Sequence, residues 1–393
     1  MRTRRVAAGE TNGSAPEGVQ RLGSALSGEG QGAGNSTREL DVRAAVASAP
    51  GKVILFGDHG VHRGQPNIIT AVDLRTSCRV AVRRDNGYRF CSGAHREEGS
   101  RDGLVAFKEH VDDLRKSNAL DEIAALNVDF FVPARYVMAT FVERQDVPGL
   151  DVEWCSALPI GSGLGSSAAA FTSMVLAAAY ASGVELSDEE VIFTAWQGDV
   201  IAHGGYGSSL DSSTCTYGGL ISYTLKDKAK RLPYELSVPL VIGDTLVAHS
   251  TSQINTQIRR WLEERPSRMH VFDDMGYLIA QAMLALKHAD VSTLGRLMNI
   301  HELLQEKMGT SCPESERLIE AALAAGALGA KINSSGCGGT IIALSEPGQQ
   351  QQVADAIEAV GGKSYIVQAA AAGVRVETDQ AWAAVINLVG SYR

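Results

Sequence analysis

The chain has 393 residues and a formal net charge of −9, with 45% hydrophobic and 21% charged residues. Its length exceeds that of one average domain, and its composition supplies a core without disulfides or structural metals. The acidic balance excludes a basic nucleic-acid-binding surface, so we expect no nucleic-acid partner. For the same reason, an anionic substrate needs cations close to its binding site.

Two further patterns bear on the location of the chain. No apolar run approaches the roughly 18 residues that cross a membrane, so we expect no membrane partner. The six cysteines are scattered and form no C-x-x-C motif, which favours reduced thiols and a cytoplasmic location. The sequence does not reveal the oligomeric state, and a homodimer is compatible with it.

Three segments are expected in chain order: a disordered tail at 1–41, an N-terminal lobe at 42–228 and a C-terminal lobe at 229–393. The tail is rich in Gly, Ser, Ala and Glu and cannot bury enough apolar area to fold. The boundary between the lobes is placed in the charged stretch that Pro233 closes. Strands are predicted at Val42–Ser48, Val53–Phe56, Asn67–Val72, Thr76–Arg83, Leu150–Ser156, Gly219–Thr224, Leu240–Asp244, Thr340–Leu344, Lys363–Gln368 and Gly373–Glu377. Helices are predicted at Leu104–Ser117, Val128–Gln145, Ser166–Ser182, Ser187–Ala202, Ile254–Glu264, Val271–Ala289, Val291–Met308, Glu314–Ala325, Gly348–Gly361 and the C-terminus.

A glycine-rich loop joins the predicted strand Leu150–Ser156 to an alanine-rich helix. Gly161, Gly163 and Gly165 stand at alternate positions in it, where they let the backbone fold closely around a ligand. The helix that follows directs unpaired N–H groups and a positive dipole into the loop, which favours a nucleotide phosphate. The loop has neither the Lys-Ser/Thr end of a Walker loop nor the G-x-G-x-x-G spacing of a dinucleotide site. The alternative is a plain strand-to-helix turn.

A second segment places a lysine where a core does not need one. Lys52 lies between Gly51 and an apolar strand, and Asp58 and His59 follow that strand between two glycines. These positions suit groups that contact a ligand. The alternatives are a lysine that extends from a strand end into water and ordinary turn chemistry for the Asp-His pair.

Two carboxylates flank a second glycine-rich loop at 204–209. Asp199 lies at the end of a predicted helix, and Asp211 follows the loop. One carboxylate suits Mg²⁺, which takes few protein ligands beside water and phosphate, and the other suits a hydroxyl proton. Two solvated or capping acids are the alternative. A third small-residue segment at 329–340 precedes an apolar strand and suits phosphate or substrate contact, or a flexible hairpin.

Together these segments resemble the motifs of the GHMP kinase superfamily. Residues 50–59 match its Pro-Gly-Lys-x-x-Leu-x-Gly-(Glu/Asp)-His pattern, and 159–169 match Pro-x-Gly-x-Gly-Leu-Gly-Ser-Ser-Ala-Ala. Residues 331–339 match Lys-x-x-x-x-Gly-x-Gly-Gly. Within the superfamily the chain most resembles the mevalonate kinase branch, especially its shorter prokaryotic type, over about residues 45–377.

The resemblance implies an α+β fold of two lobes, with the active site in the cleft between them. It implies ATP and Mg²⁺ as cofactors and a small-molecule alcohol as the acceptor, which for this branch is the primary hydroxyl of mevalonate. It assigns the ATP phosphates to Pro159, Gly161, Ser162, Gly163, Leu164, Gly165, Ser166 and Ser167.

The same resemblance implies roles for the remaining motif residues. Ser167, or its neighbour Ser166, would give a hydroxyl to Mg²⁺ together with Asp199. Asp211 matches the catalytic aspartate, and Lys52 would pair with it. Acceptor contacts fall on Asp58, His59, Gly336 and Gly338.

The chain departs from the family pattern mainly near the acceptor and the metal. Asp199 stands where a glutamate is usual, so a metal must lie closer or be reached through water. The third motif carries Ser334, Ser335 and Cys337 in place of small residues, and Ser252 replaces a lysine. A sugar kinase of the same superfamily is therefore an alternative, and a non-catalytic ligand sensor is another.

Overall fold

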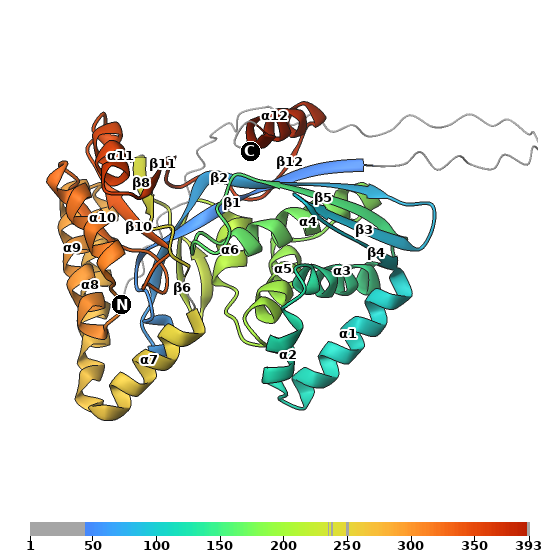
Figure 1. Cartoon of the computed structure of the whole chain (residues 1–393), viewed down its shortest axis with the longest axis horizontal. Helices are drawn as coiled ribbons and strands as arrows, with labels where there is room; N and C mark the ends of the chain where they lie inside the picture. Colours follow the sequence, from blue (N-terminus) through green and yellow to red (C-terminus); the bar gives the residue numbers. More distant parts are fainter. Residues whose placement is uncertain (1–43, 235, 237–238, 249–250, 391–393) are drawn as a thin grey trace, which may run out of the picture. The chain divides into compact units, whose positions relative to one another are not determined.

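The computed structural model describes residues 44–390 except 235, 237–238 and 249–250. The predicted tail at 1–41 lies outside the described residues. Within them the chain forms two β-sheets with helices packed on both (Figure 1). No helix among these residues has the length and apolarity that a membrane crossing requires.

The larger sheet has the order β12-β1-β2-β5-β3-β4, with β6 paired to β2 and β7 paired to β6. Its pairs are antiparallel except for the parallel pair β3–β5. Its strands are β1 (Ala44–Phe56), β2 (Asn67–Val82), β3 (Gly87–Ser92), β4 (His95–Ser100), β5 (Leu150–Ser156), β6 (Leu220–Thr224), β7 (Lys228–Arg231) and β12 (Arg375–Glu377).

β1 and β2 are each one long strand where the sequence predicts two. Their register shifts between Pro50 and Gly51, where the partner of Pro50 is Arg75 and that of Gly51 is Val72. Asp73 and Leu74 of β2 therefore form a β-bulge opposite Pro50-Gly51. The Pro50-Gly51 pair does not end a strand, because β1 continues in the same sheet beyond it. A Cβ on Gly51 would lie 2.5 Å from the Leu158 side chain, so the bulge also brings β1 against the glycine-rich loop.

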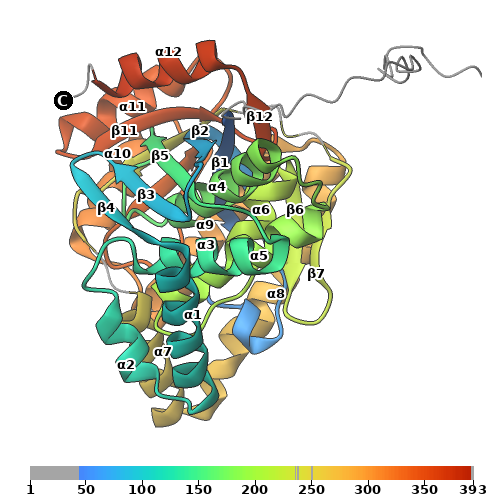
Figure 2. The same cartoon turned by 90° about the vertical axis from the view of Figure 1, so that its right-hand side faces the viewer.

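Helices cover this sheet on both faces. α4 (Ser166–Ser182) packs directly on β1 and β2, and α3 (Val132–Gln145) and α5 (Asp188–Ala202) pack around it (Figure 2). α12 (Asp379–Gly390) lies on the opposite face (Figure 1). α4 is rich in alanine and buried along most of its length, which lets its backbone approach the sheet closely. The remaining helices of this part are α1 (Arg101–Lys116), α2 (Leu120–Leu126) and α6 (Leu210–Tyr217).

The smaller sheet is antiparallel, with the order β11-β8-β10-β9. Alternate residues of its strands enter two different cores, as Val241 and Ile242 do on β8, because successive side chains of a strand point to opposite faces. Its strands are β8 (Pro239–Asp244), β9 (Gly329–Ile332), β10 (Thr340–Leu344) and β11 (Lys363–Gln368). Its helices are α7 (Thr251–Glu264), α8 (His270–Lys287), α9 (Val291–Met308), α10 (Pro313–Ala324) and α11 (Gln350–Ala359).

The end of the chain returns to the larger sheet. β12 pairs with β1, so that Glu377 lies opposite Val46. The predicted boundary between residues 228 and 229 falls within β7, which pairs with β6 in the larger sheet. The two sheets therefore do not divide at one point of the sequence.

Candidate active site

The glycine-rich loop lies between the end of β5 and the start of α4. Gly161, Gly163 and Gly165 have φ of 73°, 81° and 72°, a left-handed conformation that favours glycine. A Cβ on Gly165 would lie 2.9 Å from Cγ of Lys52. The free N–H groups at the start of the 17-residue helix α4 face this end of the loop, which gives the arrangement of an anion site.

Lys52 lies on β1 beside this loop and pairs with Asp211, in the first turn of α6. The distance from Lys52 Nζ to Asp211 Oδ1 is 3.2 Å. The lysine side chain is only 4% exposed, whereas that of Asp211 is 30% exposed, so the carboxylate can meet a ligand. The Lys52 backbone N–H also donates to the carbonyl oxygen of Leu164 at 2.9 Å. The loop and the ion pair are thus held to each other.

Asp199 is buried at the end of α5 and faces two serine hydroxyls. Its Oδ1 accepts a hydrogen bond from Ser167 Oγ at 3.2 Å, and its Oδ2 accepts one from Ser212 Oγ at 2.6 Å. Burial, followed by the negative charge of Asp211, raises the pKa of Asp199 to about 6. Sequence reasoning missed Ser212, because its place beside Asp199 depends on how α6 packs against α5.

This donor set fits Mg²⁺. Ser167 and Asp199 offer hard oxygen atoms, and the negative charge of Asp211 near the buried Asp199 carboxylate favours a divalent cation at this place. No group of three His, Cys, Asp or Glu residues that could hold a metal alone occurs within the part of the chain that the structure describes. A magnesium ion here would therefore depend on phosphate oxygens as well, as it does in most nucleotide sites.

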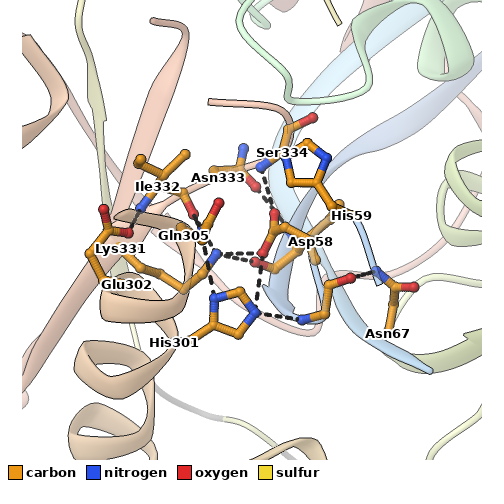
Figure 3. Close-up of polar contacts among 12 residues, drawn as sticks. Asp58, His59, Asn67, His301, Glu302, Gln305, Lys331, Ile332, Asn333 and Ser334 are labelled. Carbon is orange, nitrogen blue, oxygen red and sulfur yellow. Dashed lines mark hydrogen bonds and ion pairs between the residues drawn. The ribbon is translucent and has the colours of Figure 1, made fainter. Parts of the chain in front are cut away.

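Asp58 lies in a buried network rather than on an open surface (Figure 3). Its Oδ2 accepts a hydrogen bond from Lys331 Nζ at 2.8 Å, and both side chains are fully buried. Its Oδ1 accepts one from the backbone N–H of Ser334 at 2.8 Å. Both carboxylate oxygens are therefore engaged, and Asp58 joins the first motif to the third.

His59 lies at the edge of this network, in a left-handed conformation with φ of 63°. Its Nε2 is 3.0 Å from the carbonyl oxygen of Ser335. Burial lowers the pKa of His59, which favours the neutral ring. Gly336 serves local packing, because its φ is 82° and a Cβ there would lie 2.2 Å from the carbonyl oxygen of Thr310. Gly338, with φ of 113°, also needs the freedom of glycine.

Asn333 and Thr340 connect the third motif to the glycine-rich loop. Asn333 Nδ2 donates to the Gly163 carbonyl at 3.3 Å and to Thr340 Oγ1 at 3.0 Å. Thr340 Oγ1 donates to the Ser162 carbonyl at 2.9 Å, and Asn333 Oδ1 accepts the Ile54 N–H at 3.0 Å. We refer to Asn333 and Thr340 as the loop clamp. No local sequence signal pointed to it, since both residues are ordinary in a turn and a strand.

The sequence also gave no signal for three polar residues of α9 below this network. His301 Nε2 accepts the N–H of Gly57 at 2.9 Å, and Glu302 Oε2 accepts the N–H of Ile332 at 2.7 Å. Gln305 donates to the Ile332 carbonyl at 3.2 Å. Their helical spacing is typical of a core face. Only the tertiary structure reveals that His301 supports the turn after β1 and that Glu302 and Gln305 support the end of β9 (Figure 3).

Family models and similar sequences identify the same family of kinases. The family described as GHMP kinases N terminal domain matches residues 133–219, and that described as GHMP kinases C terminal matches residues 282–363. The mevalonate kinase of Pyrococcus horikoshii is 34% identical over 343 residues, which cover 86% of this chain and 98% of that protein. The mevalonate kinase of Archaeoglobus fulgidus is 31% identical, with 84% and 99% covered.

Solved structures share the fold. The mevalonate kinase of L. major in complex with R-mevalonate has a TM-score of 0.66 at 24% identity and covers 83% of this chain and 95% of its own. The galactokinase of Lactococcus lactis complexed with galactose also has a TM-score of 0.66, at 16% identity, with 86% and 95% covered. At these identities the two structures support the architecture and do not discriminate between acceptors.

Proposed function

This chain belongs to the GHMP kinase family, and from that membership we propose that it transfers the terminal phosphate of ATP to the primary hydroxyl of mevalonate. The observation that carries the proposal is the Lys52–Asp211 pair, 3.2 Å apart beside the glycine-rich loop at the start of α4. The relatives named mevalonate kinase, at up to 34% identity over most of the chain, support this acceptor over a sugar.

In the proposed reaction, Asp211 accepts the proton of the acceptor hydroxyl as its oxygen attacks the terminal phosphorus. The bond between that phosphorus and the bridging oxygen breaks, so phosphomevalonate and ADP are the products. Lys52 stabilises the negative charge that develops on the attacking oxygen. The loop Gly161–Ser167 holds the remaining phosphates, because phosphoryl transfer depends mainly on positioning and electrostatics.

We assign Mg²⁺ to Ser167 and Asp199, where it would neutralise phosphate charge when bound. Ser212 donates a hydrogen bond to Asp199 and so holds its side chain in place. A cytoplasmic location fits the six cysteines, which all lie within the described residues and form no disulfide there. A homodimer and the absence of nucleic-acid partners remain predictions.

Two substitutions test the site. We expect Asp211→Asn and Lys52→Met to lower kcat by about 10²–10⁴-fold, the range for loss of a positioned acid–base or charge-stabilising group. Both variants should still fold and bind ATP, as measured by thermal melting and by titration calorimetry. Asp227→Asn, a solvent-exposed carboxylate bonded to Thr224, is the matched control and should keep full activity. Full activity in Asp211→Asn would reject the site.

A coupled assay for ADP release decides the acceptor. Mevalonate is compared with galactose, homoserine and other free alcohols at equal concentration, and we expect turnover with mevalonate. Turnover with a sugar alone would show a sugar kinase. Binding of ATP without turnover on any acceptor would show a non-catalytic sensor.

A further inference from the structure

Arg63 lies directly after the turn that carries Asp58 and His59. It ends the short 3₁₀ helix Val61–Arg63, and its Nη1 donates to the His59 carbonyl at 2.8 Å. Its guanidinium also stacks on the ring of Phe272, 4.7 Å from the ring centroid. These two contacts fix the plane of a half-buried arginine and leave most of its five N–H donors free for a ligand.

A second arginine, on α7, lies near enough to Arg63 for their charges to interact. Thr251, Asn255 and Arg259 follow one another at intervals of four residues, so they lie on one face of this helix. The first of them contacts Ser335 at 3.2 Å, and the second hydrogen-bonds His59. Arg259 is the next residue along this face. Burial, followed by the positive charge of Arg259, lowers the pKa of Arg63, which agrees with that placement.

This pair borders the phosphate site through the third motif. A Cβ on Gly163 of the loop would lie 2.9 Å from Cβ of Ser334, and the next residue, Ser335, contacts His59. His59 in turn accepts the hydrogen bond from Arg63 through its carbonyl. A chain of direct contacts therefore runs from the loop to the arginine pair.

The two positive charges have no negative partner in the structure. Within residues 44–390 and outside the stated gaps, neither Arg63 nor Arg259 takes part in an ion pair. In a chain with a net charge of −9, two adjacent guanidinium groups without a carboxylate repel each other, and an anion between them relieves the repulsion.

We propose that Arg63 and Arg259 bind the carboxylate of the acceptor and so select a hydroxy acid over a neutral alcohol. This inference rests on the proposed function, because it supplies the anion-binding half of a substrate whose hydroxyl meets Asp211. Guanidinium groups suit this role, since their planar N–H forks match a carboxylate in two-point contact. The pair would also supply the positive charge that a lysine at position 252 usually provides. Arg63 lies four residues after His59, and Arg259 lies eight residues after Thr251 at the start of α7.

The test compares two acceptors that differ only in charge. Mevalonate and 3-methylpentane-1,3,5-triol carry the same primary hydroxyl, but the triol has a neutral hydroxymethyl group where mevalonate has its carboxylate. We expect Arg63→Met and Arg259→Met each to raise the KM for mevalonate about 10- to 100-fold, the effect of losing a hydrogen bond to a charged group. The kcat for mevalonate, the KM for ATP and the kcat/KM for the triol should change little. Arg260→Met, next to Arg259 on a different face of α7, is the control.

Two further comparisons distinguish a loss of substrate binding from a loss of folding. Arg259 is exposed, so its variant should fold and report on binding even if Arg63→Met fails to fold. Arg63→Lys should recover part of the affinity. Equal losses for mevalonate and the triol, or no loss for mevalonate, would overturn the inference while the proposed function stands. A wild-type protein that phosphorylates the triol and sugars but not mevalonate would overturn both.

Discussion

His301 and Glu302 are neighbours on α9, and burial shifts the pKa of each toward its neutral form. The pKa of His301 is lowered to about 3, and that of Glu302 is raised to about 7. Their ordinary values are 6.5 and 4.5. As pH falls from 6.5 to 4.5, only the unfolded chain protonates the histidine, which destabilises the fold. Over the same interval only the folded chain holds a proton on the glutamate, because the unfolded chain leaves this carboxylate ionised until about pH 4.5, and this difference stabilises the fold. The two effects oppose each other.

Single substitutions should expose each effect. In His301→Gln, the glutamate acts alone, so the free energy of unfolding should rise by up to about 2 kcal/mol relative to wild type as pH falls from 6.5 to 4.5. In Glu302→Gln, it should fall by a similar amount over the same interval. Urea unfolding at a series of pH values measures both slopes. Parallel pH profiles for the wild type and both variants would contradict the assignment.

Gly165 and Gly161 form a matched pair of left-handed glycines, with φ of 72° and 73°. Alanine at either position meets similar backbone strain, of about 1 kcal/mol. Only at Gly165 does the added Cβ also collide with Lys52, whereas nothing lies within 4 Å at Gly161. Gly165→Ala should therefore lower kcat by at least about tenfold more than Gly161→Ala does, measured at saturating ATP and acceptor. Equal kcat values would mean that Lys52 moves aside freely.

The loop clamp operates between elements, since it ties the turn after β5 to β9 and β10. Loss of either side chain leaves a loop carbonyl without its donor, and each such hydrogen bond contributes about 1 kcal/mol. We expect Asn333→Ala and Thr340→Val each to raise the KM for ATP about fivefold. Thr340→Ser keeps the hydroxyl and should stay near the wild-type value. A KM for ATP that is unchanged in Thr340→Val would show that the loop holds its shape without the clamp.

The elements that the sequence predicted well are those whose signals are local. α4 begins and ends at the predicted residues because Gly165 and Gly183 flank it in left-handed conformations, and α5 begins after Ser187, whose side chain caps it. α6 was missed because its sequence, rich in Ser and Thr, has weak helix propensity. Its inner residues are almost completely buried, so tertiary packing decides its conformation. The bulge opposite Pro50-Gly51 and the strand β7 depend on pairing partners in the same way.

At the scale of the whole molecule, the α+β fold expected from the GHMP motifs is confirmed by the family matches and the solved structures. The residues predicted to contact the ATP phosphates form one contiguous motif, which the structure places in a single loop at the start of α4, and their role stays a prediction. The sequence did not reveal that both oxygens of Asp58 are occupied by Lys331 and Ser334. Nor did it reveal the pairing of Arg63 with Arg259. Both arrangements join segments about 200 or more residues apart, beyond the range of any local pattern.

Arg75 holds the returning C-terminal segment against the larger sheet. It donates to the carbonyls of Ala372 and Gly373 at 2.7 and 2.8 Å, and to both the carbonyl and the hydroxyl of Ser48 at 2.7 Å. Arg75→Met removes these four hydrogen bonds and should lower the free energy of unfolding by roughly 2–4 kcal/mol. Limited proteolysis should then cut near residue 372. Arg79→Met, on the same strand, is the control, and an equal loss there would remove any special role for Arg75.

The bond between the Ser48 hydroxyl and the Glu377 carboxylate spans 329 residues of the chain, and this separation sets an order of events during synthesis. A ribosome that adds 5–20 residues per second needs roughly 16–66 s to make the intervening chain. For all of that time β1 has one unpaired edge. Until residue 333 has been made, β1 and the turn after it also lack Asn333 and Lys331. The nascent protein therefore cannot complete the buried network around Asp58 before residue 334 is made. Chains that end before that residue should be inactive, and chains that end before β12 keep the unpaired edge of β1, which favours aggregation.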